Sequence, residues 1–204
     1  MIRNHLPQIV LTGLLLCLSL SGCISRSHPQ TTYFSLMTIE QLEMEKPLAT
    51  LRDTRIGVGP VTIPDSLKYA QIVTRSQGNR YRFSETNRWI GSLEKDITAV
   101  VSHNIGYLLA SGEVAAFPWP NYFQPNYRVV IDIEQLDGEL GGEAELKARW
   151  FFVDEKSEKL METGQVSHRR ITFDSSHAAL VEAESQLVAM LSRDIAAVIM
   201  RQIN

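Results

Sequence analysis

The histidines of the chain do not form a recognised metal-binding motif. There are five, and none belongs to a His-Glu-x-x-His sequence: His5, His28, His103, His168 and His177. Zinc hydrolases commonly place two such histidines four residues apart on one helix face. A zinc site built on His168 and His177 would need further ligands that the sequence does not supply. We therefore expect these side chains to be hydrogen-bonded or solvent-facing, and we expect no metal and no cofactor.

Two carboxylates could act as an acid–base pair. Asp132 and Glu134 alternate on a predicted strand and would point to the same face of a sheet. Glycosidases use such a pair to protonate the leaving group and to attack or activate water. A solvated sheet face beside Arg128 is the favoured interpretation.

The glycines do not complete a nucleotide-binding or hydrolase motif. Gly57-Val58-Gly59 is half of a dinucleotide-binding loop, and Pro60 and Ile63 depart from the remainder. A Gly-x-Ser-x-Gly nucleophile elbow does not occur in the sequence. The sequence therefore favours glycines that ease a bent strand, and it predicts that the protein is not an enzyme.

Cys23 is the residue with the clearest predicted chemistry. Residues 1–22 are typical of a secretory signal, with Arg3 before the apolar run 9–20. Twelve helical residues span about 18 Å, too short for the roughly 30 Å hydrocarbon core of a bilayer. The run ends in Leu20-Ser21-Gly22-Cys23, which resembles a bacterial lipobox. We expect cleavage between Gly22 and Cys23 and acylation of the Cys23 thiol; the alternative is a free cysteine that happens to end a signal peptide.

Composition limits the remaining possibilities. The chain has 204 residues, is 44% hydrophobic and carries a net charge of −3, which is typical of a folded domain without an affinity for nucleic acid. Both cysteines lie within the first 23 residues, which excludes a disulfide scaffold. The predicted organisation is a signal peptide over 1–22, a lipidated tether over 23–31 and a single domain over 32–204.

Hydrophobic periodicity predicts the elements of this domain. Alternation and β-prone residues indicate strands at 32–36, 55–63, 128–134, 144–152 and 163–173, and a hairpin of 70–75 with 79–85. Three- and four-residue spacing indicates helices over 89–109 and 180–199, the second capped near Ser175 or Ser176. We expect Pro60 and Pro64 to confine their strand to an edge or a bulge. The fold class is α+β: a mostly antiparallel sheet with two long amphipathic helices packed on one face.

One loop is unusually aromatic. Residues 117–123, Phe-Pro-Trp-Pro-Asn-Tyr-Phe, hold four aromatic rings and two prolines. Such a loop could contact a protein or lipid partner through Trp119 and Tyr122. The simpler interpretation is a loop folded over the end of the sheet with its rings in the core.

The order and spacing of several segments resemble one family. These segments are Tyr33-Phe34-Ser35-Leu36, the run from Ile56 through Gly59-Pro60-Val61 to Pro64, residues 67–75, Asn87-Arg88-Trp89 opening a helix, Phe117-Pro118-Trp119, and Tyr127-Arg128-Val129. The chain is thereby similar to the PqiC-like ABC-type transport auxiliary lipoproteins.

The resemblance implies a non-enzymatic partner protein. It implies a lipoprotein held in the outer membrane through Cys23, facing the periplasm, that forms a homo-oligomeric ring and receives an MCE-domain protein of a PqiB-like lipid transport assembly. Isoleucine rather than aspartate at position 24 also favours the outer membrane. Partner binding is expected at Trp119, Tyr122 and Pro60. Another envelope lipoprotein, such as a lipopolysaccharide-export or Tol-type accessory, is the alternative.

Overall fold

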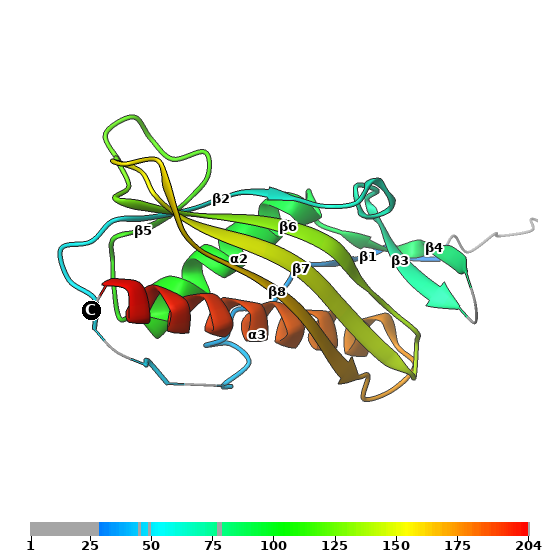
Figure 1. Ribbon diagram of the computed structural model, residues 1–204. Coiled ribbons are helices and arrows are strands. Elements are labelled where there is room, and N and C mark those ends of the chain that lie inside the picture. The colour runs from blue at the N-terminus through cyan, green and yellow to red at the C-terminus, as the bar shows by residue number, and fades with distance from the viewer. Residues whose placement is uncertain (1–28, 45, 49, 77–78, 204) are drawn as a thin grey trace, which may run out of the picture. The chain divides into compact units, whose positions relative to one another are not determined.

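The computed structural model describes residues 29–44, 46–48, 50–76 and 79–203. The predicted signal peptide, Gly22 and Cys23 lie outside the described residues. The elements run in the order β1 (Thr32–Phe34), β2 (Ile56–Thr62), a short 3-10 turn (Asp65–Leu67), β3 (Gln71–Ser76), β4 (Arg80–Trp89), α2 (Leu93–Leu108), β5 (Val114–Ala116), β6 (Tyr127–Gly138), β7 (Glu143–Asp154), β8 (Lys159–Ile171) and α3 (His177–Ile203) (Figure 1).

The strands form two mixed sheets, in which most residue pairs are antiparallel, as expected, and three strand pairs are parallel. The larger sheet has the order β5-β2-β6-β7-β8, and β2 pairs parallel with both β5 and β6. The smaller sheet has the order β1-β4-β3, in which β1 is parallel to β4. The parallel pairs arise because α2 returns the chain along the sheet between β4 and β5, so that β5 and β6 start at the same end as β2 (Figure 1). Within the described residues, the antiparallel pairs are β3–β4, which is the predicted hairpin of 70–75 with 79–85, and β6–β7 and β7–β8.

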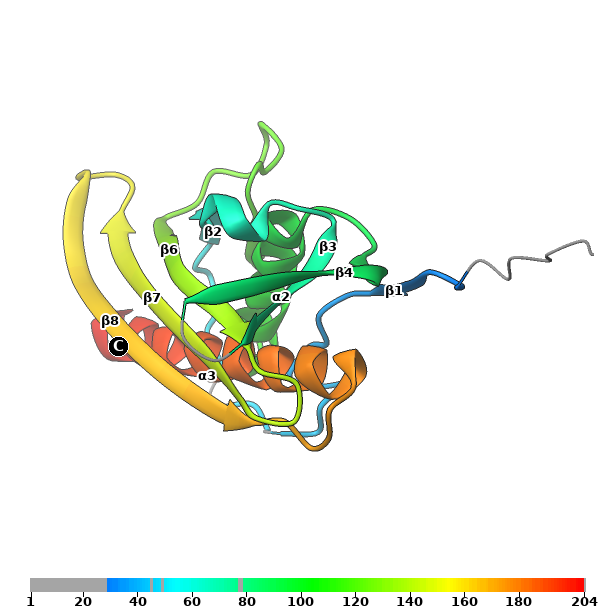
Figure 2. The same ribbon diagram turned by 90° about the vertical axis from the view of Figure 1, so that its right-hand side faces the viewer.

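Both long helices cover one face of the five-stranded sheet, as the apolar stripes predict (Figure 2). α2 lies over β2 and β5, and α3 lies over β6, β7 and β8. The strand residues that face the helices are fully buried, among them Val129, Ile131 and Phe152. The α+β class and the placement of the helices are therefore confirmed.

The first helix starts later than the sequence indicates. Asn87, Arg88 and Trp89 complete β4 rather than open a helix, because Trp89 N–H donates to the Ala70 carbonyl at 2.8 Å. α2 begins after Ser92, whose side chain accepts a hydrogen bond from Lys95 N–H at 3.4 Å. A serine side chain satisfies a backbone donor that the first helical turn leaves free. Trp89 is the last residue of β4, and its spacing from Leu93 matches a helical pattern only by chance.

The second helix matches its prediction and extends four residues further, to Ile203. Ser176 caps it, since its hydroxyl accepts from Ala179 N–H at 3.0 Å. A buried polar contact joins the two helices: the Asn104 amide donates to Ser192 Oγ at 3.2 Å, and its carbonyl oxygen accepts from Ile39 N–H at 2.8 Å. Hydrogen bonding compensates the burial of these groups.

β2 carries the irregularity that its prolines predict. Its register against β6 shifts between Val58 and Val61, so the expected bulge is confirmed. The expected edge position is wrong, because β5 pairs with residues 56–58 on the other side of β2. A three-residue neighbour covers only the start of β2, which leaves room for Pro60 beyond it.

Candidate functional site

The aromatic loop, residues Phe117–Phe123, follows directly from β5 at the end of the sheet where β2 and β6 begin (Figure 1). Phe117 N–H donates to the Val58 carbonyl at 2.8 Å, which fixes the start of the loop on β2. Phe123 N–H donates to the Pro120 carbonyl at 2.8 Å and closes a turn. The Gly59–Pro60 and Phe117–Pro118 peptide bonds are both cis.

Gly57 and Gly59 make room for the loop. A Cβ atom on Gly57 would lie 2.7 Å from a ring carbon of Trp119, and one on Gly59 would lie 2.6 Å from Phe117 Cβ. Gly59 also has a φ of 122°, which residues with side chains rarely adopt. The two glycines of β2 therefore allow the loop to pack closely on the strand. This is a structural role, as the sequence favours, and not part of a nucleotide-binding loop.

The rings of the loop divide between packing and exposure. Phe117 and Trp119 meet edge to face with ring centroids 5.2 Å apart, and Phe123 lies 6.4 Å from Trp119. Trp119 and Phe123 are half-buried, whereas Tyr122 is 85% exposed. The expectation that the rings lie in the core is wrong for Tyr122, which sits at the tip of the turn, and for Phe117, which is 47% exposed. Pro60 is exposed on the neighbouring strand.

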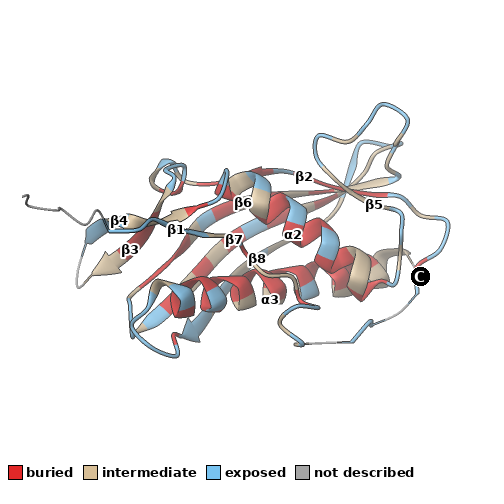
Figure 3. Ribbon diagram, turned by 180° about the vertical axis from the view of Figure 1, so that it is seen from behind, coloured by how far each residue is buried: buried red, intermediate tan, exposed pale blue. Residues whose placement is uncertain are grey.

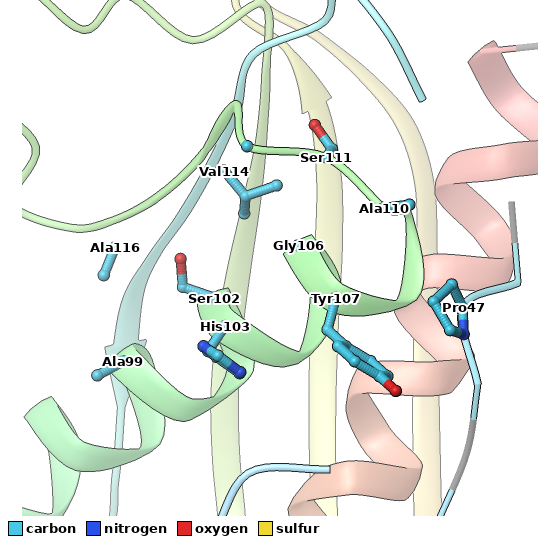
Figure 4. Close-up of a pocket in the computed structure, with 11 residues that line it drawn as sticks. Pro47, Ala99, Ser102, His103, Gly106, Tyr107, Ala110, Ser111, Val114 and Ala116 are labelled. Carbon is cyan, nitrogen blue, oxygen red and sulfur yellow. The ribbon is translucent and has the colours of Figure 1, made fainter. Parts of the chain in front are cut away.

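A hollow of about 650 Å³ adjoins the loop and is lined by one face of α2 and by β5 (Figure 4). The last strand residue that lines it, Ala116, immediately precedes Phe117, the first residue of the aromatic loop. Small side chains and two aromatic or imidazole rings line it: Pro47, Ala99, Ser102, His103, Gly106, Tyr107, Ala110, Ser111, Gly112, Val114 and Ala116. Concave, mainly apolar surfaces of this size accept partner side chains or small ligands.

The two carboxylates of β6 are held by a cation. Arg149 on β7 contacts Asp132 Oδ2 at 2.7 Å and Glu134 Oε1 at 2.8 Å, and Thr62 donates to Asp132 at 2.6 Å. The solvated-face interpretation holds, with Arg149 in the place expected for Arg128. Arg128 instead lies 2.7 Å from Glu155. The two carboxylates therefore form ion pairs on a partly exposed sheet face.

A second polar cluster lies where the two sheets meet. Arg75 of β3 contacts Asp137 of β6 at 3.1 Å. Asp137 in turn raises the pKa of Glu184, whose burial inside α3 is the larger cause of a pKa well above the ordinary glutamate value. The histidines are distributed singly: His168 contacts Asp194 at 2.7 Å and His103 contacts Glu40 at 3.4 Å. Among the described residues, no three metal-ligating side chains are grouped closely enough to hold an ion.

A family model described as "ABC-type transport auxiliary lipoprotein component" matches residues 34–196. No curated protein matches the chain. None of the helices in the described part of the chain has the length and apolar character needed to span a bilayer.

Two crystal structures show the same fold at low sequence identity. One, of an uncharacterized protein, has a TM-score of 0.67 and 17% identity and aligns with 83% of this chain and 99% of its own. The other, a protein of the DUF330 family from Xanthomonas campestris, has a TM-score of 0.64 and 10% identity and aligns with 81% of this chain and 93% of its own.

Proposed function

The chain belongs to the family of ABC-type transport auxiliary lipoproteins, and on that premise we propose that it is a non-enzymatic accessory of an MCE-type intermembrane lipid transport system. The main support for this proposal is the extent of the family match, which begins in β1 and ends within α3. The match therefore includes both sheets, both helices and the aromatic loop.

The predicted anchor supports an envelope location. In this proposal Cys23 is the acylated first residue of the mature protein, and its acyl chains hold the protein in the outer membrane with the domain in the periplasm. Each buried methylene contributes about 0.8 kcal/mol, so several chains give firm attachment. Residue 24 is isoleucine, without the aspartate that favours retention at the inner membrane.

The partner surface in this proposal is the aromatic loop with the hollow beside it. Exposed tyrosine and half-buried tryptophan side chains are the residue types that dominate protein interfaces. Tyr122 extends into solvent, the Trp119 ring packs closely over Gly57, and Pro60 lies on the adjacent strand. We propose that an MCE-domain protein docks here, and that several copies of the chain form a ring around it.

The anchor is tested by replacing Cys23 with alanine in the full-length protein. We expect Cys23→Ala to abolish incorporation of labelled palmitate, because the thiol is the acyl acceptor. Cys17→Ala, within the predicted signal, is the matched control and should leave labelling unchanged. Continued labelling of Cys23→Ala would contradict the anchor.

The partnership is tested on the intact lipoprotein by crosslinking in isolated envelopes and by light scattering in detergent. We expect crosslinks to an MCE-domain protein and a mass of several chains. A strict monomer that captures no MCE-domain protein would overturn the proposed function, even if the anchor is correct.

A further inference from the structure

The small sheet exposes aromatic and basic side chains together. Its β4 strand begins Arg80-Tyr81-Arg82-Phe83, and all four residues are exposed (Figure 3). Tyr81 and Phe83 are each 46% exposed although they are large and apolar. Tyr33, Tyr69 and Ile90 are exposed on β1 and beside the strands. We call these seven residues the small-sheet patch: Tyr33, Tyr69, Arg80, Tyr81, Arg82, Phe83 and Ile90.

The hairpin separates its rings from its arginines. Phe83 lies opposite Val73 and Tyr81 opposite Arg75, whereas Arg82 lies opposite Thr74 and Arg80 opposite Ser76. Since side chains alternate along a strand, the two rings share one face of the hairpin and the two arginines share the other. Tyr69 extends the aromatic face, with its ring centroid 5.0 Å from that of Phe83.

The charge of this sheet is opposite to that of the whole chain. β3 and β4 carry four arginines against one glutamate, a net charge of +3, whereas the complete chain has −3. One arginine, Arg75, is paired with Asp137. Glu85 lies on β4, and Glu139 lines the same hollow as Arg82. The patch therefore attracts anionic surfaces that the rest of the protein repels.

The length of the tether limits where this sheet can be. Eight residues separate Cys23 from Thr32, the first residue of β1. A fully extended chain of that length reaches about 30 Å. The 13 residues of β8 extend about 43 Å. A lipid at Cys23 thus keeps Thr32, where the small sheet begins, closer to the bilayer than one strand of the large sheet is long.

The aromatic loop lies at the other end. It precedes the first residue of β6, whereas the Arg75–Asp137 contact attaches the small sheet next to the last residue of that strand. Figure 1 accordingly shows the small sheet and the loop at opposite ends of the large sheet. If the small sheet faces the bilayer, the loop points away from it.

We propose that the small sheet meets an anionic phospholipid bilayer edge-on with the end of the β3–β4 hairpin, so that Tyr81 and Phe83 on one face and Arg80 and Arg82 on the other both reach the headgroup layer. Tyrosine is enriched at this depth because its ring is apolar and its hydroxyl is polar. Arginine side chains extend from a buried stem to the phosphate layer. This contact rests on the proposed anchor at Cys23, and it orients the partner surface toward the periplasm.

The contact is tested with the mature lipoprotein in vesicles of phosphatidylethanolamine and phosphatidylglycerol. Cys23 is acylated in this form, so Phe83→Cys provides a single thiol for an environment-sensitive fluorophore. We expect brominated phospholipid to quench this label, and we expect no quenching of the same label at Tyr122→Cys. The charge contribution is tested with Arg80→Glu/Arg82→Glu in the Phe83→Cys background, which should lose most of the quenching.

Lys156→Glu/Lys159→Glu is the matched control, because it makes the same charge change at exposed positions of the β7–β8 turn. It should leave the quenching of the Phe83→Cys label unchanged. High salt should weaken the contact, since the screening length decreases from about 30 Å at 0.01 M to about 3 Å at 1 M.

The outcomes separate the contact from the anchor. A protein that carries palmitate and floats with the vesicles, yet shows no quenching at Phe83→Cys, would overturn the contact and leave the anchor intact. An Arg80→Glu/Arg82→Glu variant that keeps its quenching but loses a crosslinked protein would identify the patch as a protein-docking surface instead. A protein that neither carries palmitate nor floats would overturn the anchor and, with it, the contact.

Discussion

Glu184 places an ionisable group in the core of the protein. Its side chain is 2% exposed, and its Oε2 atom has no hydrogen-bond partner within the described part of the chain. Burial disfavours the charged carboxylate, and the negative charge of Asp137 adds to the effect, so the pKa of Glu184 lies well above the ordinary value. Asp137 is itself paired with Arg75 at 3.1 Å.

This pKa shift predicts a pH-dependent stability. Between the ordinary and the raised pKa the native state keeps a proton that the unfolded chain has released, so the free energy of unfolding decreases as the pH rises through that window, by about 1.4 kcal/mol for each pH unit. Glu184→Gln, which cannot ionise, should remove this decrease and stabilise the protein at neutral pH. Urea unfolding measured from pH 5 to pH 8 checks it, with the exposed Glu182→Gln as control. Parallel curves for the wild type and Glu184→Gln would contradict a raised pKa.

The helices stabilise the fold through continuous apolar stripes. α2 buries residues such as Leu93, Ile97 and Ile105, and α3 buries Leu187, Leu191 and Ile195. The contact of Asn104 with Ser192 fixes the relative position of the two helices, because an amide at this depth must find its partner. The packing of α2 and α3 therefore combines apolar burial, which is not specific to one arrangement, with one specific polar contact.

Shortening a buried leucine tests this packing. Leu191 is fully buried in α3, and Leu191→Ala should lower the free energy of unfolding by about 2–5 kcal/mol, since it removes apolar contacts and leaves a cavity. Leu160→Ala on β8, where the side chain is 51% exposed, should change it by less than about 0.5 kcal/mol. Denaturant unfolding of the two variants makes the comparison. Equal midpoints would show that the assigned helix face is not the buried one.

At the scale of the whole molecule, the two ends of the large sheet carry different surfaces. One end has the small-sheet patch, which is basic and aromatic, and the other has the aromatic loop and its hollow. Strand β6 separates them over its 12 residues, about 40 Å. Such a distance allows one end to contact a membrane while the other receives a partner.

The loop prediction uses this separation. Tyr122→Ala should weaken capture of the MCE-domain partner by about 2 kcal/mol or more if the ring is an anchor, roughly 30-fold in affinity. The double variant Trp119→Ala/Tyr122→Ala should weaken capture further. Because the Trp119 ring packs over Gly57, circular dichroism is needed to show that this variant is folded. Tyr69→Ala, an exposed tyrosine of the small-sheet patch, is the control and should leave capture unchanged. Equal losses for Tyr69→Ala and Tyr122→Ala would show that the two ends do not act separately.

The sequence by itself determined the local elements and the family. Alternation predicted the strands β6, β7 and β8, and three- and four-residue spacing predicted both helices and their shared face. Pro60 predicted the bulge in β2 because proline cannot donate to the ladder. The lipobox-like tetrapeptide ending at Cys23 predicts the anchor from covalent chemistry alone, which requires no knowledge of the fold.

Only the tertiary structure decided which distant segments meet. Strand order is set by pairings such as Ile56 with Tyr127, which no local pattern encodes, so the parallel strands escaped prediction. Trp119 approaches Gly57 because β5, which leads into the aromatic loop, pairs with β2, and Arg149 contacts Asp132 because the two residues lie opposite each other in the β6–β7 register. The alternating Arg80-Tyr81-Arg82-Phe83 segment is visible in the sequence, yet alternation alone normally indicates one buried face. That these four residues are exposed, while Ile72 and Val73 on the paired strand are buried, is a property of the assembled fold.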